Sequence, residues 1–210
     1  MKQSVAVTVQ RNNKGHSFEE FLPRDVLSTI FTYLTFHDMA ACCQVSKVWS
    51  QFLDSVKDIS IAMAKRWGES VATRVAILEF ATKRFHNLTS IGIVFHSRLN
   101  ALRASSTGTR LAIRDLLAKN YRQLQQFYFV GQYNALGFAL EPLAKATNLR
   151  SLTLDRYRFI NLNELMSLLD NKPNLRSFTC KNLKFHDTAA RRGGHTLDDL
   201  FNSFIHFRIG

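Results

Sequence analysis

One short apolar pattern recurs along most of the chain and constrains its fold more than any other feature. An apolar residue is followed, after two intervening residues, by a second apolar residue and, after one more, by a third. The copies of the pattern are Val56-Ile59-Ile61, Leu88-Ile91-Ile93, Leu124-Phe127-Phe129, Leu149-Leu152-Leu154 and Leu175-Phe178-Cys180. Successive copies begin 25 to 36 residues apart, and a recurrence of this period indicates stacked structural repeats.

A segment with apolar residues at helical spacing precedes each copy after the first. These segments run over residues 75–80, 111–117, 136–143 and 162–169. The alternation within each copy is typical of a strand, so strands and helices alternate along the chain. A unit of one strand and one helix cannot bury its apolar side alone and must stack on its neighbours. The predicted fold class of this region is therefore α/β, a solenoid of alternating parallel strands and helices.

The recurring pattern resembles the leucine-rich repeat. The copies at residues 147–154 and 173–180 read TNLRSLTL and PNLRSFTC. The chain departs from the family where Asn or Cys is usual and has His96, Gln132, Tyr157 and Leu183 instead. The resemblance implies a short horseshoe of the ribonuclease-inhibitor type, with a target protein held on the concave face of its strands.

Strand geometry separates buried from exposed positions in this array. If the apolar residues of each copy face inward, the residues between them share the opposite face. The residues predicted to be exposed there are Ser90, Gly92, Gln126, Tyr128, Ser151, Thr153, Ser177 and Thr179. From this face we take Tyr128, Ser151, Thr153, Ser177 and Thr179 as candidate substrate-binding residues.

The stretch from Phe18 to Leu53 predicts three short helices. Pro23 can begin the first without losing a needed N–H group. A stripe at helical spacing follows, formed by Val26, Leu27, Ile30, Phe31 and Leu34. Thr35 and Asp38 are spaced as a capping box for the second helix, and Ser46 can cap the third. Helices this short cannot enclose a core, so they expose apolar side chains that need a partner.

The same stretch resembles the F-box, a helical module that binds the Skp adaptor of cullin-RING ubiquitin ligases. The corresponding residues are Leu22-Pro23, Asp25, Ile30-Phe31, Leu34, Asp38-Met39 and Val45-Ser46-Lys47-Val48-Trp49. Met39 replaces the usual Leu, and Cys42-Cys43 stand where small apolar residues are usual. The adaptor-binding residues that the resemblance implies are Leu22, Pro23, Val26, Leu27, Ile30, Phe31, Leu34, Val45 and Trp49.

The net charge of +12 belongs to the repeat region. Residues 1–60 contain equal numbers of basic and acidic side chains, so the excess lies in residues 61–210. Stacking predicts a basic rim formed by Lys83, Arg84, Lys119, Arg122, Lys145, Arg150, Lys172 and Arg176. Two explanations remain open for it. The rim keeps the array soluble, or it guides an acidic or phosphorylated partner, with Arg150 and Arg176 joining the substrate-binding residues.

Composition and cysteine usage indicate a globular protein of a reducing compartment. Hydrophobic residues make up 46% of the chain and charged residues 21%. Cys42 and Cys43 are adjacent and Cys180 is distant, so no disulfide framework is expected, and we expect the cytoplasm or the nucleus. No apolar run is long enough to span a bilayer, and no membrane partner is expected. Metal-ligand spacings are absent, so we expect neither a metal nor a cofactor, and no catalytic residue.

Together these interpretations predict a non-catalytic substrate-recognition subunit of an SCF-type (Skp–cullin–F-box) ubiquitin ligase. Residues 1–17 would form a flexible tail, and residues 18–55 would bind the Skp adaptor and, through it, the cullin and RING subunits. Residues 56–210 would hold a target protein for ubiquitin-dependent degradation. The sequence ends in LDDLFNSFIHFRIG with no following strand, so either this segment caps the array or further repeats follow it.

Two alternative functions remain open at this point. One is a basic nucleic-acid-binding repeat protein, which the net charge favours. The sequence contains neither a basic motif interleaved with aromatic residues nor a zinc module, so nucleic acid is the weaker expectation. The other is a Skp-binding protein that acts outside any ligase.

Overall fold

The computed structural model describes residues 23–63, 70–95, 107–133, 137–159, 162–182 and 184–185. The predicted tail at residues 1–17, Leu22 and the C-terminal segment at 197–210 lie outside the described residues. The chain divides into two compact units, residues 1–34 and 35–210, and the predicted boundary between residues 55 and 56 falls inside the second. The first unit contains helix α1 (Arg24–Tyr33), which begins directly after Pro23 as the sequence predicts.

Helices α2 and α3 open the second unit and are capped by the residues that the sequence indicates. Helix α2 (Phe36–Val45) begins with a capping box, in which the Thr35 hydroxyl accepts from the Asp38 backbone N–H and the Asp38 carboxylate accepts from the Thr35 N–H. The Ser46 hydroxyl accepts from the Trp49 N–H and so caps helix α3 (Lys47–Phe52). A 3-10 turn, η2 (Leu53–Ser55), then leads into the first strand.

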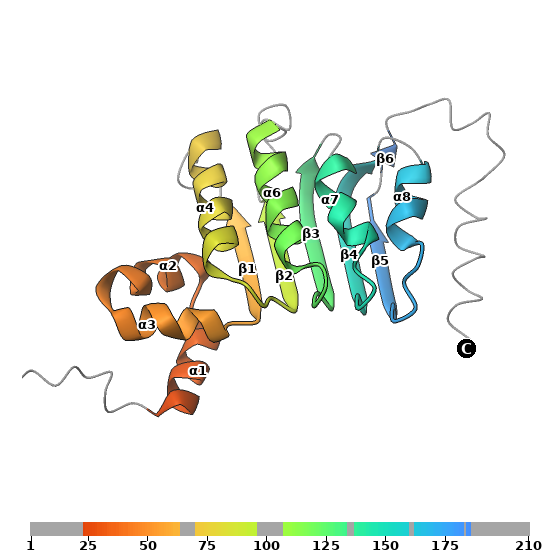
Figure 1. Ribbon diagram of the computed structural model, residues 1–210. Helices are drawn as coiled ribbons and strands as arrows, with labels where there is room; N and C mark the ends of the chain where they lie inside the picture. The colour runs from red at the N-terminus through yellow and green to blue at the C-terminus, as the bar shows by residue number, and fades with distance from the viewer. Residues whose placement is uncertain are drawn as a thin grey trace, which may run out of the picture. The chain divides into compact units, whose positions relative to one another are not determined.

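Parallel strands and helices alternate through the rest of the second unit (Figure 1). The strands are β1 (Asp58–Met63), β2 (Ser90–Phe95), β3 (Gln126–Tyr133), β4 (Ser151–Phe159), β5 (Ser177–Lys181) and β6 (Lys184–Phe185). The helices are α4 (Val71–Arg84), α6 (Thr107–Asn120), α7 (Gly137–Ala144) and α8 (Leu162–Leu169). Strands β1 to β5 pair in chain order, each parallel to the next, and β6 also pairs with β4. The helices stand side by side along one face of this sheet.

The register of the sheet brings the recurring apolar positions into two continuous rows. Ile59, Ile91, Phe127, Leu152 and Phe178 pair across the strands, and so do Ile61, Ile93, Phe129, Leu154 and Cys180. In the first four copies these residues are buried, which confirms the predicted inward positions. Phe178 and Cys180 are only half-buried, because no described strand pairs with the outer edge of β5.

The residues between the apolar positions also align, on the opposite face of the sheet. Gly92, Tyr128, Thr153 and Thr179 pair in one row, and Ser90, Gln126, Ser151 and Ser177 pair in the next. The prediction that Gly92 is exposed is wrong. A Cβ on Gly92 would lie 3.5 Å from Tyr128 Cδ1 and 3.3 Å from Ser60 Oγ, so these neighbouring side chains cover it.

A series of side-chain amides joins successive repeats where the strands begin. The residue before the first Leu of a copy donates from its side-chain amide to a backbone carbonyl of the preceding repeat. The bonds run from Gln123 Nε2 to His86 O (2.9 Å), from Asn148 Nδ2 to Arg122 O (2.6 Å) and from Asn174 Nδ2 to Thr147 O (3.1 Å). Each acceptor lies two residues before the first Leu of its own copy, so the units repeat in hydrogen bonding as well as in apolar pattern.

Gly131 is a position where only glycine fits. It lies in β3 at φ +154°, where the register with β4 is irregular. A Cβ there would lie 2.8 Å from Phe95 Cβ, which is closer than side chains can pack. We expect Gly131→Ala to lower the free energy of unfolding by about 1–3 kcal/mol in urea titrations. Gly108→Ala is the control, because its Cβ would have a single neighbour, Val75 Cγ2 at 3.3 Å, and no contact as close as the one at Gly131. Equal effects of the two substitutions would contradict this account.

Candidate functional site

Helix α1 carries two neighbouring rows of apolar side chains with different burial. Leu27 and Phe31, one helical turn apart, are only 3% and 5% exposed. Val26 is exposed, and Ile30, one turn further along, is half-buried. Of the residues that the F-box resemblance implies in this helix, Leu27 and Phe31 are therefore not part of its exposed surface. Tyr33, which the sequence analysis did not single out, is the most exposed large apolar residue among those described.

The remaining residues implied by the resemblance lie at or beyond the ends of α1. Pro23 is exposed and Leu34 is half-buried. Trp49, in α3, is half-buried, and its backbone N–H is fixed by the Ser46 cap. Val45 ends α2. Each unit thus offers partly exposed apolar side chains in this stretch, Val26, Ile30 and Leu34 in the first and Trp49 in the second, a composition suited to binding another protein.

Aromatic packing joins α2 to the repeat region. Phe36 of α2 is buried, and its ring packs edge-on against Phe80 of α4, with centroids 5.9 Å apart. The Phe36 ring also packs against Phe85, which follows α4, with centroids 6.0 Å apart. The Arg84 guanidinium donates to the Ser50 carbonyl and hydroxyl in α3 and lies 3.8 Å from an Asp54 carboxylate oxygen. Helices α2 and α3 therefore belong to the same packed body as the first repeats.

The polar face of the sheet gathers the candidate substrate-binding residues. Tyr128 and Ser177 are exposed, whereas Ser151, Thr153 and Thr179 are half-buried. The strand register places all five on β3, β4 and β5 in adjacent rows. This surface consists of hydroxyl groups around one large aromatic side chain. It can donate and accept hydrogen bonds without contributing charge of its own.

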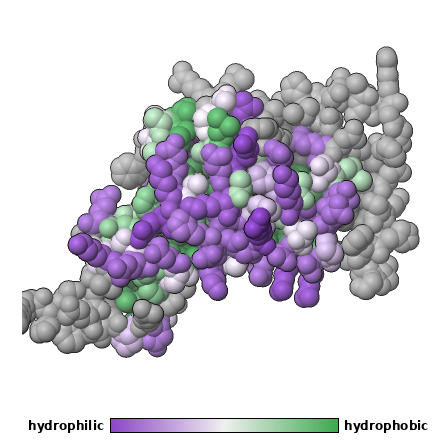
Figure 2. Space-filling view, in the orientation of Figure 1, coloured by the Kyte–Doolittle hydropathy of each residue, from purple (hydrophilic) through white to green (hydrophobic). Residues whose placement is uncertain are grey.

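Arg150 and Arg176 lie beside one another at the edge where the strands begin. The Arg176 backbone N–H donates to the Arg150 carbonyl at 2.8 Å, and both side chains are exposed. Arg150 also lines a polar hollow of about 150 Å³, together with Gln125, Asn148 and Asn174. In Figure 2 hydrophilic side chains line this lower edge of the sheet. We call this region the strand-entry edge.

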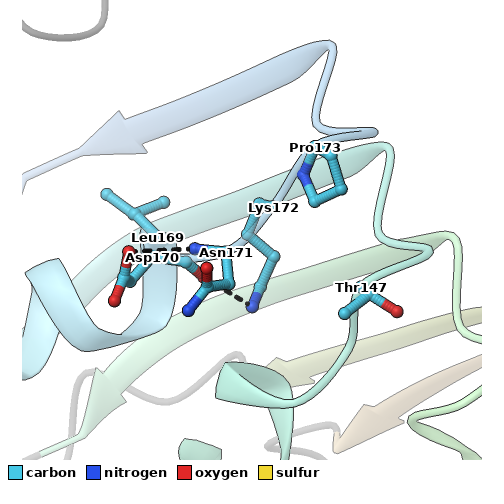
Figure 3. A pocket seen from close by; sticks show the side chains of 6 residues that line it. All are labelled: Thr147, Leu169, Asp170, Asn171, Lys172 and Pro173. Atoms are coloured by element: carbon cyan, nitrogen blue, oxygen red, sulfur yellow. Dashed lines mark hydrogen bonds between the residues drawn. The ribbon is translucent and has the colours of Figure 1, made fainter.

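The prediction of a continuous basic rim is wrong at Lys172. This side chain is 4% exposed, and its Nζ donates to the carbonyls of Ala144 (2.6 Å) and Asp170 (3.1 Å). Burial lowers the pKa of the Lys172 ammonium group. Figure 3 shows the side chain between Asp170 and Thr147, at a hollow of about 540 Å³ that Leu169, Asn171 and Pro173 also line.

Several rim cations instead bind the end of the preceding helix. Lys172 bonds to the last residue of α7, the Lys119 ammonium group donates to the Thr82 carbonyl near the end of α4, and Arg84 binds α3 in the same way. The final carbonyls of a helix have no hydrogen-bond donor within the helix, and they carry partial negative charge. A cation at this end therefore supplies the missing hydrogen bond and a favourable charge interaction. These residues are structural, and the free cations of the rim are fewer than the sequence indicates.

Cys180 in β5 lacks the environment of a reactive cysteine. Burial raises the pKa of the Cys180 thiol to about 12, so it is not an activated nucleophile. No cluster of three metal-binding side chains occurs in the part of the chain that the structure describes. Within the same part, no helix has the length and apolarity needed to cross a membrane.

Comparison with known proteins identifies one segment of the chain. The model of the F-box-like family matches residues 20–57, which include α1, α2, α3 and η2. No curated protein matches the chain. The chain therefore contains an F-box-like domain at its helical N-terminal region, followed by a parallel sheet with helices.

Proposed function

We infer that this protein is a substrate-recognition subunit of an SCF-type ubiquitin ligase. The observation that carries the proposal is the F-box-like domain at residues 20–57, because F-box domains are typically non-catalytic modules that bind a Skp-type adaptor. The adaptor would bring the cullin and RING subunits. The ubiquitin-transfer chemistry would then belong to the ligase and its conjugating enzyme, in the cytoplasm or the nucleus.

The adaptor would bind apolar residues of the N-terminal helices. The surface that we assign to it consists of Leu22, Pro23, Val26, Ile30, Leu34, Val45 and Trp49. Leu27 and Phe31 are buried, and we assign them to the stability of the domain and not to direct contact. Burial of such side chains against a partner is the main favourable term in protein association.

The sheet and its helices would act as leucine-rich repeats that hold the target protein. Three features support this assignment: strands paired in chain order, apolar rows in register, and amide bonds repeated from unit to unit. Tyr128, Ser151, Thr153, Ser177 and Thr179 lie on one face and would contact the target. Because α2 packs on α4, the adaptor-binding helices α2 and α3 are fixed relative to this face, which would hold the target in a defined position for ubiquitin transfer.

Affinity purification of the tagged full-length chain from proteasome-inhibited cells tests this proposal. We expect the Skp adaptor and a cullin to co-purify, together with ubiquitin-conjugated target proteins. Recovery of the adaptor without a cullin would favour a Skp-binding role outside a ligase. Nuclease-sensitive recovery of nucleic acid without the adaptor would favour the nucleic-acid-binding alternative and contradict the proposal.

A further inference from the structure

Arg150 and Arg176 occupy equivalent positions in consecutive repeats, each directly after the first Leu of its copy. The strands that follow pair from Ser151 with Ser177, so the two arginines are neighbours across the ladder. Adjacent strands lie about 4.8 Å apart, and two long side chains at that separation can reach a common point. Within the described part of the chain, neither guanidinium group has a hydrogen-bond or ion-pair partner.

The local sequence places no negative charge beside these two cations. Residues 121–126, 145–151 and 171–177, which lead into β3, β4 and β5, contain no Asp or Glu. Two like charges held side by side repel one another, and an anion bound between them removes that repulsion. Arginine suits this task because its planar guanidinium donates two parallel hydrogen bonds to a phosphate or carboxylate.

The hollow beside the arginines adds neutral hydrogen-bond donors. Asn148 and Asn174 both line it. Each side chain is held in place because its amide nitrogen donates one hydrogen bond to a carbonyl of the preceding repeat. Each amide nitrogen carries a second hydrogen, which remains available. Gln125 contributes a further amide from the neighbouring strand. The site thus combines two charged donors with neutral donors that hydrogen bonds to the preceding repeat hold in place.

A protein partner fits this surface better than a nucleic acid. Sequence-tolerant nucleic-acid binding needs cations spaced along a groove and several aromatic platforms. Here Lys172, which would extend the row of charge, is buried, and Tyr128 is the one exposed aromatic residue among the strand residues whose side chains the structure describes. The adjoining face of Ser151, Thr153, Ser177 and Thr179 is uncharged and hydroxyl-rich, as expected for contact with a peptide.

We propose that Arg150 and Arg176 form a two-arginine clamp that binds a phosphorylated serine or threonine of the partner held on the polar face. This inference rests on the proposed function and specifies its substrate class: the target is recognised after phosphorylation. Phosphorylation adds a charge of about −1.5 to −2 with three acceptor oxygens, so it can satisfy both guanidinium groups at once. The clamp would therefore separate modified from unmodified targets.

The test uses the full-length chain and a capped peptide, Gly-Ser-Gly-phosphoserine-Gly-Ser-Gly, followed by nuclear magnetic resonance titration. We expect the peptide to shift the arginine side-chain N–H signals of residues 150 and 176, and the unphosphorylated peptide to leave them unchanged. The variant Arg150→Gln with Arg176→Gln should weaken binding by about tenfold or more, because it removes both charged donors.

A matched control removes the same charge elsewhere. Lys57 and Lys83 are exposed, and the double variant Lys57→Gln with Lys83→Gln should keep the wild-type affinity. Absence of binding to the phosphopeptide, an equal loss in both double variants, or equal competition by a random DNA duplex would each overturn the clamp.

Adaptor binding of every variant is measured in parallel, to separate this inference from the proposed function. The arginine variant should bind the Skp adaptor as the wild type does. A wild-type chain that binds the adaptor but not the phosphopeptide would overturn the clamp alone. A wild-type chain that binds the phosphopeptide but not the adaptor would overturn the ligase role and leave the clamp in place.

Discussion

Phe129→Ala is expected to lower the free energy of unfolding by about 3–5 kcal/mol, as measured by denaturant titration. Phe129 is fully buried in β3, where it pairs with Ile93 of β2 and Leu154 of β4. Its ring packs against Phe95 with centroids 5.8 Å apart. Truncation to Ala loses the favourable free energy of burying the ring and leaves a cavity between β3 and its neighbours β2 and β4. Domains are stable by only about 5–15 kcal/mol, so the loss is a large fraction of the total.

Tyr128→Ala is the matched control for this substitution. Tyr128 is the preceding residue on the same strand and points to the opposite face, where it is 43% exposed. Its truncation should cost less than about 1 kcal/mol, because a partly exposed ring loses less packing. Similar losses at both positions would show that β3 does not separate a core face from a solvent face, and would contradict the repeat assignment.

Val26→Lys is expected to weaken adaptor binding by about 2–4 kcal/mol while the protein stays folded. The Val26 side chain is 38% exposed, so the free protein tolerates a charge there. In the proposed complex the same position would be covered by apolar partner surface, and a buried, unpaired ammonium group is costly. Binding is measured by calorimetry and folding by circular dichroism. Trp49→Ala should weaken binding by a similar amount.

Leu111→Lys controls for the introduction of a charge at an exposed apolar position. Leu111 lies on α6 and is 40% exposed, which matches Val26 closely, but it lies outside the F-box-like segment. This variant should bind the adaptor with unchanged affinity. If Val26→Lys and Leu111→Lys weakened adaptor binding equally, the assignment of the interface to α1 would be wrong.

The parallel strands with alternating helices could be predicted because the signals for them are local and periodic. The apolar positions of each copy recur at fixed offsets, and their pairing across β1 to β5 follows once the copies stack. The same holds for the caps, since Thr35 with Asp38 and Ser46 with the Trp49 N–H need only short spacings along the chain. Periodicity and capping residues act within one element, so the sequence is enough to recognise them.

Tertiary contacts account for what the sequence did not reveal. Val26 and Leu27 are equally apolar, and only packing decides which row of α1 is buried. The sequence predicts that Lys172 is a surface charge, but its ammonium group donates to the carbonyls of Ala144 and Asp170. The amide series had a signal in Gln123, Asn148 and Asn174, each directly before the first Leu of a copy. The sequence alone does not show that these amides bond to carbonyls of the preceding repeat, because those carbonyls come close only in the folded chain.

The most direct test of the central claim is the binding of purified full-length protein to purified Skp adaptor, measured by isothermal titration calorimetry. The account predicts a one-to-one complex with a negative heat-capacity change, since apolar surface is buried, and a much weaker complex for Val26→Lys. A folded wild-type protein that gives no binding heat and elutes separately from the adaptor in gel filtration would contradict it.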